Sequence, residues 1–306
     1  MDFFVTILGS GAATPKRDRQ CSSQVVNING FKMLVDCGEA AQHQVRATHQ
    51  RMQSLGTIFI SHLHGDHIFG LPGLLSSMHL CGRTEPVTVF SPRGLREAMQ
   101  TLFRISNTVP QYEINYVEID ASEPVEVFRN ARCVVTAFPL DHSVPCYGYL
   151  FEENQPFFNI RKEAIERYAL SPADIQLVKE GADFRAPDGT VVPNGELTLP
   201  KRPVHRYAYC CDTAYTESIL PVVEGVDLLC MESTFANDFA SVAAEKRHCT
   251  ALQAAQLARK AHVGRLLLTH FSARYSDVAP LLEEAQSVFP DTIAAADGMT
   301  FAVKSL

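Results

Sequence analysis

Ser61-His62-Leu63-His64-Gly65-Asp66-His67 brings three imidazoles and a carboxylate together in one short stretch of the chain. The preceding residues, Thr57 to Ile60, form an apolar run that predicts a short buried strand. The following residues, Ile68 to Leu75, predict the start of an apolar helix. The cluster is therefore expected on a loop that leads from a strand into a helix.

These side chains are the usual nitrogen and oxygen ligands of zinc and similar ions. In an extended segment His62 and His64 point to the same side, because side chains alternate with period two, so one ion can take both. Asp66 and His67 lie beyond the turn at Gly65 and are expected to face a second ion. The alternative is a set of solvated loop residues. The zincin helix motif is absent at this site, which favours a loop-borne hydrolytic metal centre.

Bulk properties narrow the class of protein without choosing one. The chain has 306 residues, enough for one large α/β domain or two of ordinary size. A formal net charge of −7 and a pI near 5.9 mean that any RNA contact must come from local basic patches. Nine cysteines without a Cys-x-x-Cys pair indicate reduced thiols in a cytoplasmic protein. The sequence predicts neither a signal peptide nor a transmembrane helix, so no membrane partner is expected.

The remaining pattern predicts an alternation of strands and helices. A hairpin is expected at Asn29-Gly30, and Thr250-x-x-Gln253 predicts a capping box that opens a helix. Strands are expected at residues 24–29, 31–35, 86–90, 113–119, 124–138, 207–213, 226–231 and 265–269. Helices are expected at 39–54, from a Ser91-Pro92 cap to 106, at 161–168, from a Ser171 cap, at 250–262 and at 276–288.

The stretch from His62 to His67 resembles the His-x-His-x-Asp-His signature of the metallo-β-lactamase fold, an α/β fold built as a four-layer αββα sandwich. Further matches narrow the resemblance to ribonuclease Z, the endonuclease family that trims tRNA 3′ ends. Residues 36–39 are similar to the family's Asp-Cys-Gly-Glu segment, in which Asp36 is expected to support the site rather than to bind metal. Residues 15–20 resemble the Pro-x-Lys-x-Arg-Asn loop associated with reading the tRNA 3′ end, with Arg17 for Lys and Gln20 for Asn. A solvated basic loop is the alternative there.

Two later elements extend the resemblance. Residues 231–234 are similar to the family's His-Glu-Ala-Thr element, with Met231 for His and Ser233 for Ala, and residues 248–250 are similar to its His-Ser-Thr loop. His248 stands just before a predicted helix N-terminus, which favours a phosphate oxygen and disfavours imidazolium. An acid role for His248 therefore requires a carboxylate such as Glu232 to raise its pKa.

The resemblance implies a complete site. One zinc ion would be held by His62, His64 and His142, and a second by Asp66, His67 and His270, with Asp212 as the bridging ligand. Manganese, iron and cobalt suit the same ligands. Asp66 would also take the proton of the attacking water, and His248 with Glu232 would serve the leaving 3′ oxygen of the tRNA. Arg17, Arg19 and Arg274 are expected to bind the substrate, a tRNA precursor, and the resemblance implies a homodimer.

We expect residues 1–306 to form a single domain of this fold with an arm-like insertion at about 151–206. Its position matches the protruding arm by which ribonuclease Z enzymes hold tRNA, but the family's Gly-Pro motif is not evident and its charges are mixed. Two alternatives stay open. A small-substrate phosphodiesterase of the same fold, acting for example on cyclic nucleotides, would share the ligands without needing an arm. A non-catalytic RNA-binding homologue predicts lost ligands, and none is missing.

Overall fold

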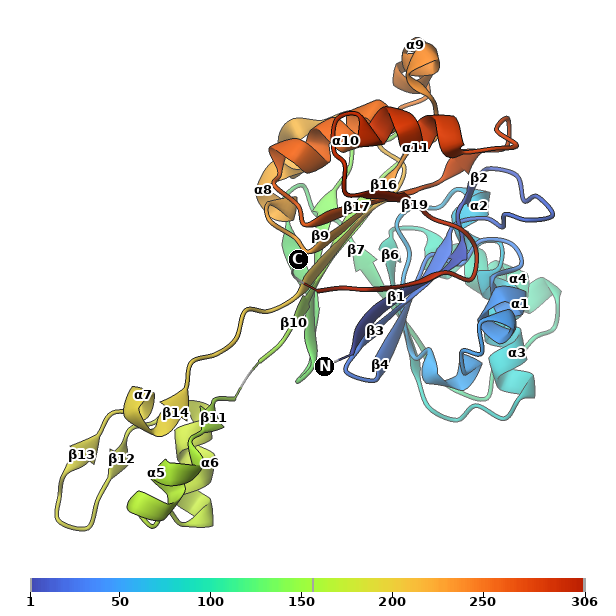
Figure 1. Ribbon diagram of the computed structural model, residues 1–306. Coiled ribbons are helices and arrows are strands. Elements are labelled where there is room, and N and C mark those ends of the chain that lie inside the picture. The colour runs from blue at the N-terminus through green and yellow to red at the C-terminus, as the bar shows by residue number, and fades with distance from the viewer. Residues whose placement is uncertain (1, 156, 305–306) are drawn as a thin grey trace. The chain divides into compact units, whose positions relative to one another are not determined.

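The computed structural model describes residues 2–155 and 157–304 and divides into two compact units. The described residues of 1–128, 135–151 and 205–306 form the first unit, and those of 129–134 and 152–204 form the second. In the first unit two seven-stranded sheets lie face to face, with helices on both outer faces (Figure 1). This arrangement confirms the predicted α/β sandwich of the metallo-β-lactamase type.

The first sheet combines an antiparallel and a parallel half. Its order is β20 (Thr300–Ala302), β1 (Phe3–Gly9), β3 (Ser23–Ile28), β4 (Phe31–Val35), β5 (Thr57–Phe59), β6 (Val87–Pro92) and β7 (Ile114–Ile119). Asn29 and Gly30 join β3 to β4 with φ values of 52° and 84°, as a two-residue hairpin turn requires. From β4 to β7 all pairings are parallel. The predicted hairpin is thus confirmed.

The second sheet supplies most of the strand ends that matter for the site. Its order is β19 (Thr292–Ala294), β17 (Arg265–Thr269), β16 (Leu228–Glu232), β15 (Arg206–Cys210), β10 (Tyr147–Glu153), β9 (Cys133–Pro139) and β8 (Val125–Arg129). Strands β15, β16, β17 and β19 are parallel. Because parallel strands are covered on both faces, β16 is buried along its whole length. The four strands run in the same direction, so their carboxyl ends meet at one edge of the sheet.

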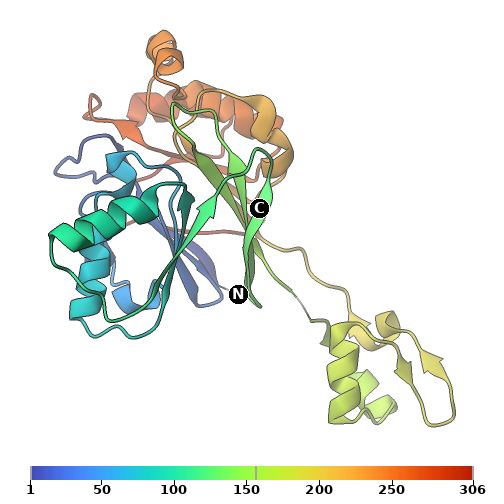
Figure 2. The same ribbon diagram turned by 180° about the vertical axis from the view of Figure 1, so that it is seen from behind.

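Helices cover the outer faces of both sheets (Figures 1 and 2). On α3 (Leu71–Leu80) the buried side chains Leu71, Leu74, Leu75 and Met78 follow helical spacing and pack in one core cluster with β4, β5 and β6. The same face carries α1 (Ala41–Ala47) and α4 (Leu95–Ile105), and the other sheet carries α8 (Leu220–Val223), α10 (Ala251–Lys260) and α11 (Ala279–Gln286). Thr250 and Gln253 form the predicted capping box of α10.

Aromatic side chains fill the space between the sheets close to residues 61–67, which we call the metal loop. Phe59 of β5 lies 5.2 Å from the ring of Tyr149 and 5.6 Å from that of Phe151, both on β10. The Tyr149 hydroxyl donates to the Ile60 carbonyl at 2.7 Å, and the Tyr147 amide donates to the Ser61 carbonyl at 3.0 Å. The start of the metal loop is therefore fastened to the second sheet as well as to its own strand.

Three predicted elements are wrong in their limits. Ser91-Pro92 does not cap a helix, because β6 pairs with β7 as far as Pro92, and α4 begins at Leu95 after Gly94 has adopted a φ of 108°. The helix expected over 39–54 is interrupted after α1, and a 3-10 helix, η1 (Met52–Ser54), follows His49, which has a φ of 56°. The strand expected over 124–138 is divided by a turn in which Asn130 accepts from two backbone amides.

The second unit has elements and a small core of its own. It contains α5 (Lys162–Arg167), α6 (Pro172–Glu180) and α7 (Asn194–Leu197), with the strand pairs β11 (Asn159–Ile160)–β14 (Thr198–Leu199) and β12 (Phe184–Arg185)–β13 (Val191–Val192). Ser171 caps α6 in a capping box with Asp174, as predicted. The core is formed by Ala164, Leu170, Val178, Phe184, Val192 and Leu197. In neither described part of the chain is there a helix long and apolar enough to cross a membrane.

Candidate metal centre

The seven predicted ligands converge at one edge of the two sheets, in two groups. In the first group, His62 Nε2 lies 3.0 Å from His64 Nδ1, and His142 Nε2 lies 3.3 Å from the same atom. In the second group, Asp66 Oδ2 lies 3.6 Å from His67 Nε2 and 3.5 Å from His270 Nε2. The loop after β5 and the short helix α2 (Gly65–Ile68) carry four of these residues, and β9 and β17 lead into His142 and His270.

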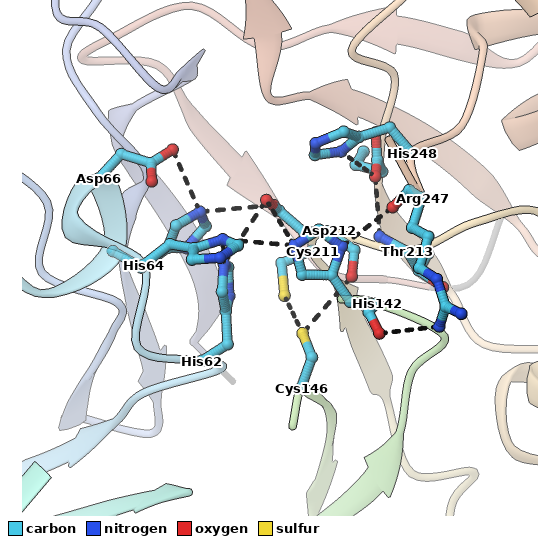
Figure 3. Close-up of polar contacts among 12 residues, drawn as sticks. His62, His64, Asp66, His142, Cys146, Cys211, Asp212, Thr213, Arg247 and His248 are labelled. Atoms are coloured by element: carbon cyan, nitrogen blue, oxygen red, sulfur yellow. Dashed lines mark hydrogen bonds and ion pairs between the residues drawn. The ribbon is translucent and has the colours of Figure 1, made fainter. Parts of the chain in front are cut away.

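Asp212 stands between the two groups and presents a different oxygen to each (Figure 3). Its Oδ2 lies 3.6 Å from His62 Nε2 and 3.8 Å from His142 Nε2. Its Oδ1 lies 3.4 Å from His67 Nε2 and 3.1 Å from His270 Nε2. A single carboxylate thus faces both groups, as a bridging ligand must.

Asp36 fixes the orientation of His67. This buried carboxylate accepts from His67 Nδ1 at 2.7 Å, from the Tyr209 hydroxyl at 2.8 Å and from both the amide and the hydroxyl of Ser61. Because the Ser61 hydroxyl donates its hydrogen bond to Asp36, its oxygen accepts one from His62 Nδ1 at 3.1 Å. Both imidazoles therefore carry a proton on Nδ1 and turn Nε2 toward Asp212.

Two further imidazoles are fixed in the same way. His142 Nδ1 lies 3.0 Å from the Arg247 carbonyl, which can only accept, so this nitrogen carries the proton. The Thr234 hydroxyl donates to Glu232 at 2.6 Å and so accepts from His270 Nδ1 at 2.9 Å. Hydrogen bonds to the outer nitrogen are the usual means by which proteins orient metal-binding histidines.

The residues present fit a pair of metal ions. Among the described residues, His67 Nε2, His270 Nε2 and Asp212 Oδ1 are buried polar atoms without a hydrogen-bond partner. Buried polar groups are rarely left unpaired, because an unmade hydrogen bond costs free energy. A cation between these imidazole nitrogens and the carboxylate oxygens that face them would satisfy all of these atoms. The donor set matches borderline and hard ions such as zinc or manganese.

The charge state of the site agrees with this fit. Burial alone would raise the pKa of Asp212, but the imidazoles of His270, His67 and His62 hold it well below its usual range. Burial holds the pKa of His62 well below its ordinary value, so its ring is neutral. Burial would also lower the pKa of His67, yet Asp212 and Asp36 raise it well above the ordinary value. These two carboxylates favour a positive charge at His67, which a metal ion at Nε2 would supply in place of a proton.

Glu232 and His248 form the pair predicted from the sequence. Glu232, the last residue of β16, is fully buried and accepts from His248 Nδ1 at 2.8 Å and from the Thr213 amide at 2.8 Å. Burial alone would lower the pKa of His248, but the Glu232 carboxylate raises it to about 9. One nitrogen of His248 also lies within 4.8 Å of ligand atoms of Asp212 and His270. A buried carboxylate thus holds the imidazole beside the two groups of predicted ligands.

A cavity of about 310 Å³ opens over the two groups of ligands. His64, Asp66, Asp212, His248 and His270 line it, together with the cationic side chains of Lys246 and Arg274. The Arg274 guanidinium lies over two rings, 4.8 Å from Phe235 and 4.5 Å from Phe239. The predicted substrate residue Arg274 is therefore brought to the site. Lys246 was not predicted, although its place two residues before His248 was a usable signal.

The other two predicted substrate residues are placed differently. Arg17 is exposed and is not among the described residues that line this cavity. Arg19 points back to the protein, since its guanidinium lies 5.3 Å from the Phe271 ring and donates to the Tyr275 carbonyl at 3.5 Å. Asp297 anchors both ends of their loop: it accepts from the amide and hydroxyl of Ser10 and from the amide of Gln20. Asp297 was not predicted, and its only signal in the sequence is the Asp297-Gly298 pair, which is typical of a turn.

Two facing sheets with histidine and aspartate ligands at one edge define a metal-dependent hydrolase of the metallo-β-lactamase fold. The structure is similar to that of the metallo-beta-lactamase fold protein YhfI from Bacillus subtilis, with a TM-score of 0.71 at 20% identity, covering 98% of this chain and 99% of the other. It is also similar to the short form of human tRNase Z, ELAC1, with a TM-score of 0.71 at 26% identity, covering 98% of this chain and 99% of that one.

Sequence comparison identifies the family. The chain is 41% identical to ribonuclease Z of Bacteroides thetaiotaomicron over 99% of its own length and 96% of the relative, and 44% identical to ribonuclease Z of Porphyromonas gingivalis over 97% and 98%. Residues 3–160 also match the family model described as Anti-Pycsar protein Apyc1. The chain belongs to the ribonuclease Z family, which comprises metal-dependent endoribonucleases.

The contacts of Asp36 predict the effect of replacing it. In Asp36→Asn one oxygen becomes an amide group that cannot accept from Ser61, Tyr209 or His67, so His67 loses its fixed orientation. We expect zinc affinity, measured by competition with a chromophoric chelator, to fall by about 10- to 100-fold. Asp120→Asn, at a carboxylate that is 80% exposed, is the control and should bind as the original protein does. An unchanged affinity in folded Asp36→Asn would contradict the role assigned to Asp36.

Proposed function

We propose that this protein is a two-zinc endoribonuclease that removes the 3′ trailer from tRNA precursors. Cleavage would leave a 3′-hydroxyl on the tRNA and a 5′-phosphate on the trailer. The observation that carries the proposal is the Asp212 carboxylate, which faces both groups of ligands within a cavity that His248 also lines. The ribonuclease Z relatives and human tRNase Z, short form, extend over nearly the whole chain and support a tRNA substrate.

His62, His64 and His142 would hold one ion, Asp66, His67 and His270 the other, and Asp212 both. Two such ions would lower the pKa of a water molecule and stabilise the oxygens of an in-line phosphoryl displacement. Asp66 would accept the proton of the attacking water. Its Oδ2 is positioned by the Ala13 amide, which donates to it at 2.7 Å, and its neighbouring imidazoles favour the ionised carboxylate.

His248 would donate the proton that the leaving oxygen needs. The Nδ1–H group of its ring is held by Glu232, which leaves Nε2 of a cavity-lining imidazole for the substrate. A ribose 3′ oxygen is a poor leaving group, so general acid catalysis at this position is worth about 10²- to 10⁴-fold in rate. Figure 3 draws Asp66 and His248 on opposite sides of Asp212, which suits a water that attacks from one side and an oxygen that leaves on the other.

The remaining substrate contacts would come from cationic groups and from the second unit. Arg274 and Lys246 are suited to phosphate oxygens at the cavity, and Arg17 and Arg19 would contact the 3′ end from the loop that Asp297 anchors. We propose that residues 1–306 form a single domain of the metallo-β-lactamase fold, with the second unit as an arm-like insertion that binds tRNA. The cytoplasmic location and the homodimer are predictions from the resemblance, and light scattering of the purified protein tests the homodimer.

The central test uses a tRNA precursor that carries a 3′ trailer. The purified protein with zinc or manganese should release the trailer, and Asp66→Ala should lower the rate by at least about 100-fold, because it loses a ligand and the proton acceptor. End-group analysis of the two products checks the 3′-hydroxyl and the 5′-phosphate, and elemental analysis identifies the metal. Removal of metal with a chelator should abolish cleavage and its return should restore it.

Cyclic nucleotides are assayed in parallel because a small-substrate phosphodiesterase remains the alternative. Turnover of a cyclic nucleotide without any trailer cleavage would favour that alternative over the proposed function. Binding of the precursor without cleavage of either substrate would favour a non-catalytic RNA-binding homologue.

The proton-donor role of His248 predicts a dependence on the leaving group. His248→Asn should lower precursor cleavage by about 10²- to 10⁴-fold. Hydrolysis of bis(p-nitrophenyl) phosphate should fall far less, because p-nitrophenolate leaves without protonation. Glu232→Gln should behave in the same way but more mildly. Equal losses on the two substrates would show that His248 supports the metal centre instead of donating a proton.

An RNA-binding role of the second unit predicts a charge dependence. Reversal of its exposed cations Lys162, Arg167 and Lys179 to Glu should raise the KM for the precursor by roughly tenfold and weaken the salt dependence of KM, because phosphate contacts are lost. Hydrolysis of bis(p-nitrophenyl) phosphate should not change. Arg51→Glu, at an exposed cation of the first unit, is the control. An unchanged KM in the triple variant would remove the second unit from substrate binding.

A further inference from the structure

Phe69 is an aromatic side chain that the first unit leaves uncovered beside the metal loop. It follows α2 directly and is 70% exposed. Its ring lies against Gly65, where an added Cβ would come within 2.2 Å of the ring atom Cε2. The absence of a side chain at Gly65 therefore lets the ring lie close to the backbone of the metal loop. An exposed aromatic ring held in this way has a face available for a ligand.

A cavity of about 420 Å³ lies between Phe69 and the metal centre. Ala13, His64 and Asp66 line both this cavity and the one above the metal ligands. Phe69, Glu39 and Cys21 line this cavity but not the one above the metal ligands. The Phe69 cavity is thus continuous with the site of the reaction and lies on the Asp66 side of it.

The lining of the Phe69 cavity selects the chemistry of its ligand. It carries two carboxylates, Glu39 and Asp66, and neither lysine nor arginine occurs among its described residues, so a phosphate group is disfavoured. The cavity above the metal ligands differs, because Lys246 and Arg274 line it and suit phosphates. A nucleobase fits the Phe69 cavity, since every base offers a π-face for stacking and the N–H groups of its edge can donate to a carboxylate.

We propose that Phe69 and Glu39 form a subsite for the base of the first trailer nucleotide. This inference rests on the proposed function. The leaving 3′ oxygen of the tRNA must reach His248, which lines only the cavity above the metal ligands. The nucleotide on the other side of the scissile phosphate is then directed toward the Asp66 side, where Phe69 stands. Stacking is tolerant of sequence, so such a subsite accepts any base at the start of a trailer.

The test is a double-mutant cycle in which one change is made in the protein and the other in the substrate. It compares kcat/KM for a precursor with a normal first trailer nucleotide and for one in which this nucleotide is abasic. Phe69→Ala should lower kcat/KM for the normal precursor by roughly tenfold, and the abasic change should lower it by a similar factor in the original protein. The two changes together should lower kcat/KM no more than either change alone, because each of them already removes the stacking of the base on Phe69. Leu80→Ala, at an apolar side chain that is 81% exposed on α3, is the control and should leave both rates unchanged.

Two more variants separate stacking from packing on Gly65. Phe69→Trp should keep most of the normal rate, whereas Phe69→Leu, which still covers Gly65, should lose about as much as Phe69→Ala. Several results would overturn the subsite: multiplicative losses in the cycle, a normal rate for Phe69→Leu, or coupling to an abasic last nucleotide of the tRNA instead. A change of oligomeric state in Phe69→Ala without coupling would assign the ring to an interface between two copies. Failure of the original protein to cleave the normal precursor would instead overturn the proposed function itself.

Discussion

The carboxylate of Asp212 is the group on which the rest of the site depends. An ionised carboxylate that is almost fully buried is costly unless opposite charge and hydrogen-bond donors surround it. Here the surrounding groups are imidazoles from the loop after β5, from the end of β9 and from the end of β17. His62 and His67 follow a strand of the first sheet, and His142 and His270 follow strands of the second, so the face-to-face packing of the two sheets brings the partners of Asp212 together.

The outer hydrogen bonds explain why the site is held in one geometry. Asp36, Thr234 and the Arg247 carbonyl each accept a hydrogen bond from Nδ1 of an imidazole, on the side away from Asp212. Asp36 also joins the metal loop to β15 through the Tyr209 hydroxyl, which connects the two sheets by a hydrogen bond as well as by packing. Fixing tautomers in advance means that little reorganisation is needed when ions bind, because each Nε2 already points inward.

Only the contiguous part of this site could be predicted from the sequence alone. The loop from His62 to His67 could be predicted because strand periodicity and the spacing of ligands are patterns of a few neighbouring residues. The assignments of His142, Asp212 and His270 depended on resemblance, since their convergence depends on sheet order and register, which local patterns do not encode. At Ser91-Pro92 the local pattern gave a wrong prediction. These residues are typical of a helix start, but in the structure they extend β6 and pair in parallel with β7. Asp297 contributes through hydrogen bonds to Ser10 and Gln20, residues so far away in the chain that no local pattern indicates the contact.

Asp297 also bears on when the protein becomes active. Its carboxylate accepts hydrogen bonds from the amides of Ser10 and Gln20. The loop between these two residues therefore lacks its anchor until residue 297 has been synthesised. His270 and Asp212 likewise complete a ligand set that starts at His62. A nascent chain on the ribosome, with residues up to about 260 synthesised, carries the metal loop but neither His270 nor the anchor of its neighbouring loop. The growing polypeptide therefore lacks a complete set of ligands until nearly all of the first unit has been synthesised.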